Sequence, residues 1–279
     1  ITRIYDYTFT NCTSLTGITI PSTITVMDNR IFQGCTSLST ISIPSSVTTM
    51  GTYFFYGCTS LASISFSGLN LLTMGSHFFY GCTILNNVSI PNSVTTMGSY
   101  FFYGCSGLTV VSISTSITII EEYFFYLCIA IITIIIPNGV TTLSGSCFGG
   151  CGSLGSGSGG GVIIPASVQY ILSFVFILCS GLRSITINST NLLTIGDGAF
   201  EGCSTIDAIV IPSTVTSIGD GAFDGCSDLA SVTLPTDPAF VTIGDNMFKG
   251  NVSLTSITIP DSITTLGSGS FQDCNSLST

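Results

Sequence analysis

Hydrophobic and polar residues follow one pattern that recurs about every 23 residues along the whole chain. Each unit contains an alternating run, such as Ile41-Ser42-Ile43-Pro44 or Ile257-Thr258-Ile259-Pro260. A period of two is typical of a half-buried β-strand, and the proline behind it ends ladder pairing. An apolar pair three residues apart follows, such as Val47 and Met50, and then Gly51. The unit predicts a short strand, a turn and a short helical or irregular segment.

Cysteine and phenylalanine mark every unit at fixed positions. Cysteines recur at Cys12, Cys35, Cys58, Cys82, Cys105, Cys128, Cys151, Cys179, Cys203, Cys226 and Cys274, and Asn251 occupies the one slot without cysteine. Three residues before each slot stands a phenylalanine: Phe9, Phe32, Phe55, Phe79, Phe102, Phe125, Phe148, Phe176, Phe200, Phe223, Phe248 and Phe271. One unit cannot bury its apolar side alone, whereas stacked units can.

The spacing therefore predicts a solenoid of about twelve coils of 23–28 residues. We expect a parallel β-sheet on one face and short helical or irregular segments on the other. Coils that stack at the usual strand spacing of about 4.8 Å would extend for about 55 Å. The array is expected to span residues 1–279 as one domain, with a Gly/Ser-rich irregular insertion over 149–161.

These motifs resemble the BspA-type (Treponema-type) leucine-rich repeat family. C-T-S-L begins at Cys35 and again at Cys58, and I-G-D-G-A-F ends at Phe200 and again at Phe223. The resemblance covers essentially the whole chain. It implies a leucine-rich repeat solenoid that is extracellular or on a cell surface and that takes part in adhesion or recognition. It implies no catalytic residues.

Both ends of the chain lie inside a repeat unit. Terminal coils of a solenoid normally carry polar caps, and neither end shows one. We expect either that the array is part of a longer one, or that copies stack end to end into a filament.

Composition narrows the functions further. Only 6% of residues are charged, and the chain has 4 Lys and Arg against 14 Asp and Glu. So few basic residues cannot neutralise many phosphates, so nucleic acid is not an expected partner. The apolar runs Leu127–Pro137 and Ile171–Cys179 are shorter than the roughly 20 residues of a membrane span. No Ser/His/Asp set, metal-binding cluster or phosphate loop is evident in the sequence, which predicts a protein that is not an enzyme and needs no cofactor.

The recurring cysteines are expected to form a ladder of buried free thiols. Parallel side chains from equivalent positions seldom meet the torsion that a disulfide requires, although some disulfides remain an alternative. Asn251 fits a small buried group that hydrogen-bonds to a turn. Cys147 lies outside the ladder, and the sequence leaves open whether it is paired or free.

Small polar side chains occupy the outward positions of the predicted strands, where leucine-rich repeats often bind partners. This predicted sheet face comprises Thr40, Ser42, Ser63, Ser65, Asn87, Ser89, Ser184, Thr186, Ser231, Thr233, Ser256 and Thr258. The alternatives are a plain solvated surface and a hydroxyl lattice that orders water or ice.

Eight further aromatic residues recur five and two positions before the cysteine slot. This predicted aromatic stripe comprises Tyr53, Tyr56, His77, Tyr80, Tyr100, Tyr103, Tyr123 and Tyr126. It is either a contact surface for a partner chain or a sugar, or a layer that covers the buried phenylalanines. His77 is the single histidine, and we interpret it as a member of the stripe.

Asp197, Asp220 and Asp245 share one slot in which other coils carry Ser or Thr. All three residue types cap helical turns, so capping is the favoured role. Carboxylates about 5 Å apart are also a weak candidate for Ca²⁺ binding. Among the N-x-S/T sequences, Asn188 and Asn87 are the candidates for glycosylation.

Together these patterns predict an adhesion or recognition solenoid that binds protein or glycan partners through its sheet face. The alternatives are a structural protein that assembles end to end and, less favoured, a surface that orders ice or water.

Overall fold

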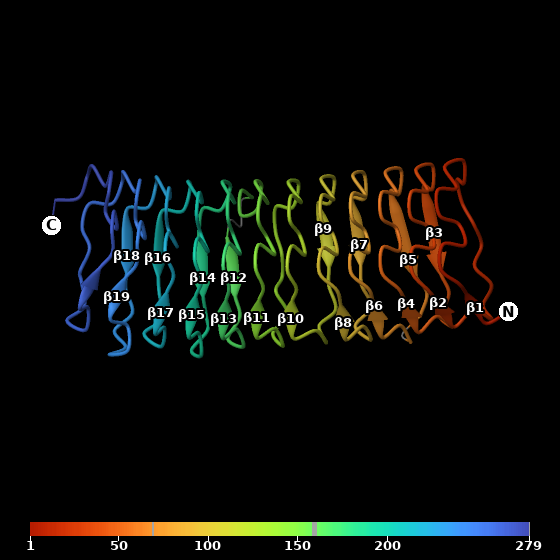
Figure 1. Cartoon of the computed structure of the whole chain (residues 1–279), viewed down its shortest axis with the longest axis horizontal. Helices are drawn as coiled ribbons and strands as arrows, with labels where there is room; N and C mark the ends of the chain where they lie inside the picture. The colour runs from red at the N-terminus through yellow and green to blue at the C-terminus, as the bar shows by residue number, and fades with distance from the viewer. Residues whose placement is uncertain (69, 158–160, 279) are drawn as a thin grey trace.

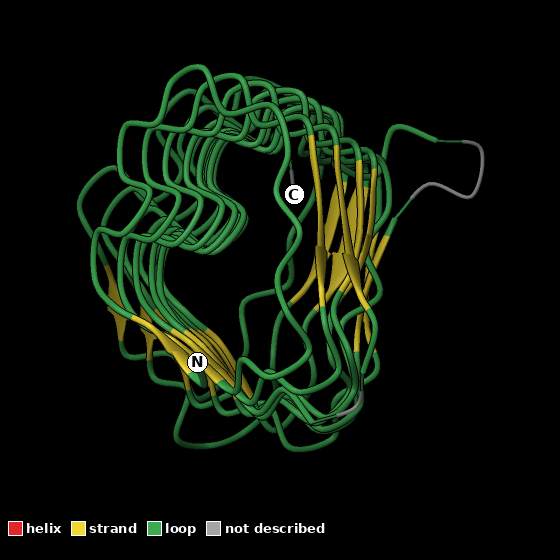
Figure 2. Cartoon of the chain, turned by 90° about the vertical axis from the view of Figure 1, so that its right-hand side faces the viewer, coloured by secondary structure: helices red, strands yellow, loops and turns green. Residues whose placement is uncertain are grey.

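The computed structural model describes residues 1–68, 70–157 and 161–278, and it confirms the predicted solenoid. The coils follow one another along a single axis (Figure 1). Viewed along that axis, they share one closed outline with strands on two of its sides (Figure 2). No described residue is helical, so the segments expected to be helical or irregular are turns.

The first sheet is built from the predicted alternating runs, and all its strand pairs are parallel. Its first part holds four strands in the order β3 (Thr40–Ile43), β5 (Ser63–Phe66), β7 (Asn87–Ser89) and β9 (Val110–Ser112). Two pairs continue it along the axis: β12 (Val162–Ile164) with β14 (Ile185–Ile187), and β16 (Ala208–Val210) with β18 (Ser231–Thr233).

The first sheet is interrupted between β9 and β12 and again between β14 and β16. Residues 132–136 continue the alternating pattern but form no strand. The coil after them contains the predicted insertion, 149–161, of which residues 158–160 lie outside the described part of the chain.

A second parallel sheet, which the sequence pattern did not predict, lies on another side of the coil (Figure 2). Its strands contain two residues each. Each strand ends at the second residue of the apolar pair, as β4 ends at Met50. The strands fall into three paired groups. The first is β1 (Arg3–Ile4), β2 (Val26–Met27), β4 (Thr49–Met50), β6 (Thr73–Met74) and β8 (Thr96–Met97), and the second is β10 (Ile119–Ile120), β11 (Thr142–Leu143), β13 (Tyr170–Ile171), β15 (Thr194–Ile195) and β17 (Ser217–Ile218). The third is β19 (Thr242–Ile243) with β20 (Thr265–Leu266).

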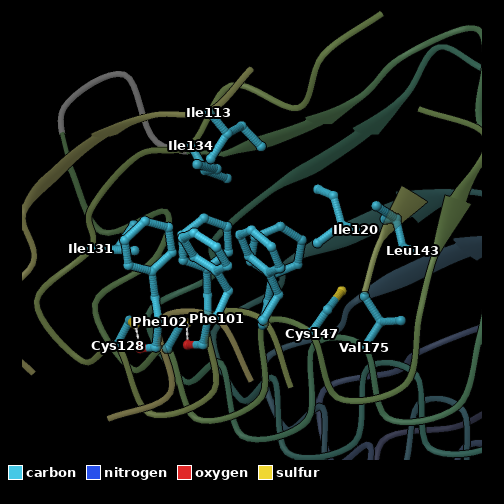
Figure 3. Close-up of a cluster of buried hydrophobic side chains, with 14 of the residues drawn as sticks. Phe101, Phe102, Ile113, Ile120, Cys128, Ile131, Ile134, Leu143, Cys147 and Val175 are labelled. Carbon is cyan, nitrogen blue, oxygen red and sulfur yellow. Dashed lines mark hydrogen bonds between the residues drawn. The ribbon is translucent and has the colours of Figure 1, made fainter. Parts of the chain in front are cut away.

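The core is a column of the twelve recurring phenylalanines. Neighbouring rings are nearly parallel, with centroids 5.3 to 5.6 Å apart, from Phe9–Phe32 through Phe248–Phe271. A second column of Phe54, Phe78, Phe101 and Phe124 meets the first edge to face (Figure 3). Aromatic pairs in these geometries add about 0.5–1.5 kcal/mol each beyond the area they bury.

Two left-handed residues in every coil produce the turns that replace a helix. Tyr53 (φ 54°) and Gly57 (φ 70°) are one such pair, five residues and one residue before the cysteine slot. All twelve coils repeat this geometry. Glycine adopts it without cost, whereas other residues lose about 1–2 kcal/mol. A tyrosine in this conformation therefore needs compensating contacts.

Candidate functional site

The first sheet presents the predicted sheet-face residues to solvent. Eleven of the twelve are exposed, and Ser184 is half-buried. Strand pairing aligns Thr40 with Ser63 and Ser42 with Ser65. Ser256 and Thr258 keep the outward position in a coil segment that forms no strand. The structure thus brings residues from distant parts of the sequence into parallel rows, spaced at the strand separation of about 4.8 Å.

Four apolar side chains on the same face were missed by the sequence reasoning. Val110, Ile135, Ile163 and Val210 are exposed by 58%, 85%, 59% and 66%. They occupy the same outward positions as the serines and threonines, so the alternating pattern of the strands could have predicted their exposure. Only polar outward residues were predicted as binding residues. The face is therefore hydroxyl-rich near β3 to β7 and partly apolar from Ile135 to Val210.

The eight residues of the aromatic stripe form two stacked rows. Ring centroids lie 4.3, 4.5 and 4.8 Å apart along Tyr53, His77, Tyr100 and Tyr123. The corresponding separations are 4.6, 4.5 and 5.1 Å along Tyr56, Tyr80, Tyr103 and Tyr126. All eight are half-buried. Inner ring faces are covered by neighbouring rings, so the rows offer ring edges and hydroxyls to a partner. A role of the stripe as a contact surface stays a prediction.

Arg30 extends the first aromatic row toward the N-terminus. Its guanidinium lies 4.5 Å from the Tyr53 ring centroid and 5.6 Å from that of Tyr7, within range of a cation–π interaction. Burial, and secondarily the charge of Arg30, lower the pKa of His77. A neutral imidazole that is stacked between Tyr53 and Tyr100 fits the interpretation of His77 as a stripe member.

The cysteine ladder is confirmed as a row of free thiols, ten of the twelve cysteines being buried. From Cys35 to Cys274, each thiol in the ladder donates a hydrogen bond to the phenylalanine carbonyl of the preceding coil, as Cys58 does to Phe32 at 3.0 Å. Burial raises the pKa of Cys151 and of Cys226 to about 12. Cys147, outside the ladder, is also buried and free (Figure 3).

The side chains in the aspartate slot accept hydrogen bonds from the backbone of the next coil. Asp197 Oδ1 accepts a hydrogen bond from the N–H of Asp220 at 3.0 Å, and Asp220 Oδ1 accepts one from Asp245 at 2.8 Å. The aspartates were predicted to cap a helical turn. They instead accept a hydrogen bond from a backbone N–H of the next coil, so the predicted donor was wrong. Within the described ranges, no three His, Cys, Asp or Glu side chains are grouped so that they could hold a metal ion.

Both candidate glycosylation sites are accessible. Asn188 directly follows β14 and is exposed. Asn87 is exposed on β7, which pairs with β5 on one side and β9 on the other. Glycosylation at either position stays a prediction.

Comparison with protein families identifies the repeat. The model of the BspA type leucine rich repeat region, in six copies, matches residues 1–76, 68–159 and 160–278. The chain belongs to the BspA-type leucine-rich repeat family.

Solved bacterial structures share this BspA-type solenoid. A leucine-rich repeat protein from Bacteroides ovatus is 26% identical, with a TM-score of 0.73 over 99% of this chain and 69% of that one. A leucine rich cell surface protein from Faecalibacterium prausnitzii is 24% identical, with a TM-score of 0.54 over 94% and 80%. A leucine-rich repeat protein from Eubacterium ventriosum is 23% identical, with a TM-score of 0.54 over 95% and 84%. No curated protein sequence matches the chain.

Proteins of the BspA-type family are built from repeats, and the candidate surfaces of this chain likewise take residues from several repeats. The described residues include no helical segment that could serve as a membrane span.

Proposed function

We propose that this BspA-type chain is a recognition or adhesion module, located on a cell surface or outside the cell. It binds protein or glycan partners through the outward side chains of the first sheet. The observation that supports this most is the register of exposed side chains on neighbouring parallel strands, where Thr40 lies beside Ser63 and Ser42 beside Ser65.

The sheet face suits recognition because strand pairing fixes the backbone beneath its side chains before a partner arrives. Serine and threonine are short, so their ordering on binding costs little conformational entropy. A pre-ordered surface loses less free energy on association than a flexible one does. Many hydroxyl contacts, each weak, can then sum to useful affinity.

The histidine and the cysteines of this chain give no basis for proposing catalysis. The single histidine is stacked between two tyrosines, and ten of the cysteines are buried as thiols. We therefore propose a binding module and not an enzyme. End-to-end assembly and the ordering of ice or water stay predictions, which sedimentation velocity and thermal hysteresis would test.

The decisive experiment compares two triple variants of the full chain on an array of matrix proteins and glycans. The first variant carries Ser42→Arg, Ser65→Arg and Ser89→Arg on the first sheet. The matched control carries Thr49→Arg, Thr73→Arg and Thr96→Arg on the second sheet, at the same level of the solenoid. We expect the first to lose binding by about tenfold or more and the control to change by less than about twofold. Equal losses, or a loss in the control alone, would contradict the proposal.

A further inference from the structure

Two leucines occupy a backbone position that glycine fills in most coils. The residue directly before the cysteine slot is left-handed in every coil, and it is glycine in eight of them: Gly34, Gly57, Gly81, Gly104, Gly150, Gly202, Gly225 and Gly250. Leu127 (φ 59°) and Leu178 (φ 57°) take this conformation at a cost of about 1–2 kcal/mol each. Their side chains are 41% and 59% exposed, so burial offsets that cost only in part. Backbone strain that packing does not offset is typical of functional positions.

The two leucines belong to one continuous apolar surface. The coil between them carries Gly149 and Gly150 at the corresponding positions. A Cβ atom on Gly149 would lie 2.8 Å from the ring of Tyr126 and 3.0 Å from Ile177, so side chains of the two flanking coils meet over this glycine. Leu127 likewise lies over Gly150. We call this surface the leucine face, and it comprises Tyr126, Leu127, Phe174, Ile177 and Leu178.

Acidic side chains border the leucine face at both ends along the solenoid axis. Glu122 is exposed in the first coil of the face, and Asp197 is exposed in the same slot three coils further on. The carboxylate of Glu201 lies beside the ring of Phe174, because both side chains use the space over Gly198. The apolar surface therefore has a negatively charged rim.

This rim indicates the charge of the partner. Arg183 is the only basic residue between Arg30 and Lys249, and it lies two residues before β14, at the first sheet. An anionic lipid surface would be repelled by the rim, and a second copy of the leucine face would bring a rim of the same charge. A partner with basic groups on both sides of an apolar surface complements it.

The backbone beneath the leucine face indicates the conformation of the partner. Leu127 N–H donates to Gly149 O at 2.8 Å, and Leu178 N–H donates to Glu201 O at 2.7 Å. Because these donors are already used between coils, an added strand would not find them free. A helix satisfies its own backbone and binds through its side chains alone.

We propose that the leucine face binds a basic amphipathic helix of a partner protein. Apolar side chains of the helix cover Leu127, Phe174 and Leu178, and lysine or arginine side chains near its two ends reach Glu122 and Asp197. Three coils at the strand spacing extend for about 15 Å, which about ten helical residues span. The inference goes beyond the proposed function, because the leucine face lies on the turns and not on the first sheet.

The test uses a blocked helical peptide, Lys-Lys-Leu-Ala-Gln-Leu-Leu-Ala-Gln-Leu-Lys-Lys. Its leucines lie on one helical face, and its lysines lie at both ends. The control peptide carries glutamate in place of every lysine and keeps the apolar face. With the full chain, fluorescence anisotropy should give a Kd below about 100 μM for the lysine peptide and at least about tenfold weaker binding for the glutamate peptide.

Two double variants locate the apolar part of the site. Leu127→Ser with Leu178→Ser should weaken binding of the lysine peptide by about tenfold or more. The matched control, Leu72→Ser with Ile84→Ser, removes two side chains of similar exposure from other coils and should change binding by less than about twofold. Circular dichroism checks that both variants fold.

Two further double variants separate the rim from the overall negative charge of the chain. Glu122→Gln with Glu201→Gln removes two rim charges and should weaken binding by about fivefold or more. Asp228→Asn with Asp261→Asn removes two exposed charges elsewhere and should change binding by less than about twofold.

Three results would overturn the inference: no binding of the lysine peptide at about 1 mM, equal binding of the two peptides, or equal losses within either pair of variants. Dimerisation in sedimentation velocity that the Leu127→Ser and Leu178→Ser changes abolish would assign the leucine face to a second copy and also overturn it. The triple-arginine variant of the first sheet should still bind the lysine peptide, so failure of this inference is distinguishable from failure of the proposed function.

Discussion

The side-chain amide of Asn251 donates a hydrogen bond to the carbonyl of Phe223 at 3.0 Å. The thiol of Cys226 makes the equivalent bond to Phe200 at 3.2 Å. The slot therefore requires a small donor that reaches the preceding coil, and this is why asparagine replaces cysteine there. Asn251 differs in one respect, because its buried Oδ1 has no hydrogen-bond partner.

Asn251→Cys should stabilise the protein. The change keeps a donor to Phe223 and removes a buried acceptor that has no partner, which should raise the free energy of unfolding by about 1–2 kcal/mol. Urea unfolding monitored by circular dichroism measures the change. Asn191→Ser, at an exposed position, is the control and should have little effect. A lower unfolding midpoint for Asn251→Cys would contradict this view of the slot.

Alkaline pH should destabilise the solenoid. The ordinary pKa of a cysteine thiol is 9.0, and burial raises that of Cys151 and of Cys226 to about 12. The folded state therefore keeps protons that the unfolded chain has already lost. The stabilisation is fully present below about pH 9, and it is lost as pH rises toward 12, by up to about 1.4 kcal/mol per pH unit for each thiol.

Urea midpoints at pH 7, 8, 10 and 11 check this dependence. The double variant Cys151→Asn and Cys226→Asn, which copies the natural side chain of slot 251, should show a shallower decrease above pH 9. An unchanged midpoint between pH 8 and 11 would show that the thiols are not buried as described.

Asp220→Ala should destabilise the protein by about 1 kcal/mol, because the N–H of Asp245 loses its acceptor. Asp220→Asn should retain most of the stability, since an amide oxygen can accept the same bond. Asp228→Ala, at an exposed position without a side-chain hydrogen bond, is the control. Thermal unfolding compares the three. Equal stability of the Asp220→Ala and Asp228→Ala variants would remove the capping role.

Tyr100 should tolerate glycine better than alanine. Its backbone is left-handed (φ 57°), and its ring stacks on His77 at 4.5 Å and on Tyr123 at 4.8 Å. Both substitutions lose the stacking, but only glycine relieves the left-handed strain of about 1–2 kcal/mol. The alanine variant should therefore unfold at lower urea concentration than the glycine variant. The reverse order would show that strain at this position is unimportant.

The repeat predicts the features that every coil shares. Phe102 and Cys105 recur in the same slots, so their column and ladder follow once coils are stacked. The second sheet was not predictable in the same way, because strands such as β4 (Thr49–Met50) are too short to show a period of two. The donor to Asp197 was misassigned because it lies 23 residues away, in the next coil.

The interruption of the first sheet after β9 illustrates a different limit. Ile134, Ile135 and Ile136 keep the alternating strand pattern, and the inward pair is buried as predicted. Pairing depends on where the neighbouring coils place their backbones, which the pattern of one unit does not encode. The exposed Ile135 and Ile163 were visible in the sequence, but their proximity emerges only from the stacked coils.

Each coil buries its thiol against the coil before it, and counting the reactive thiols of the native protein tests this packing. Cys12 is exposed and Cys274 is half-buried, whereas the other ten cysteines are buried. With a thiol-specific chromogenic reagent at pH 8, we expect Cys12 to react rapidly, Cys274 slowly, and the remaining ten only after denaturation. Rapid reaction of most thiols in the native protein would contradict the stacked solenoid and the surfaces built on it.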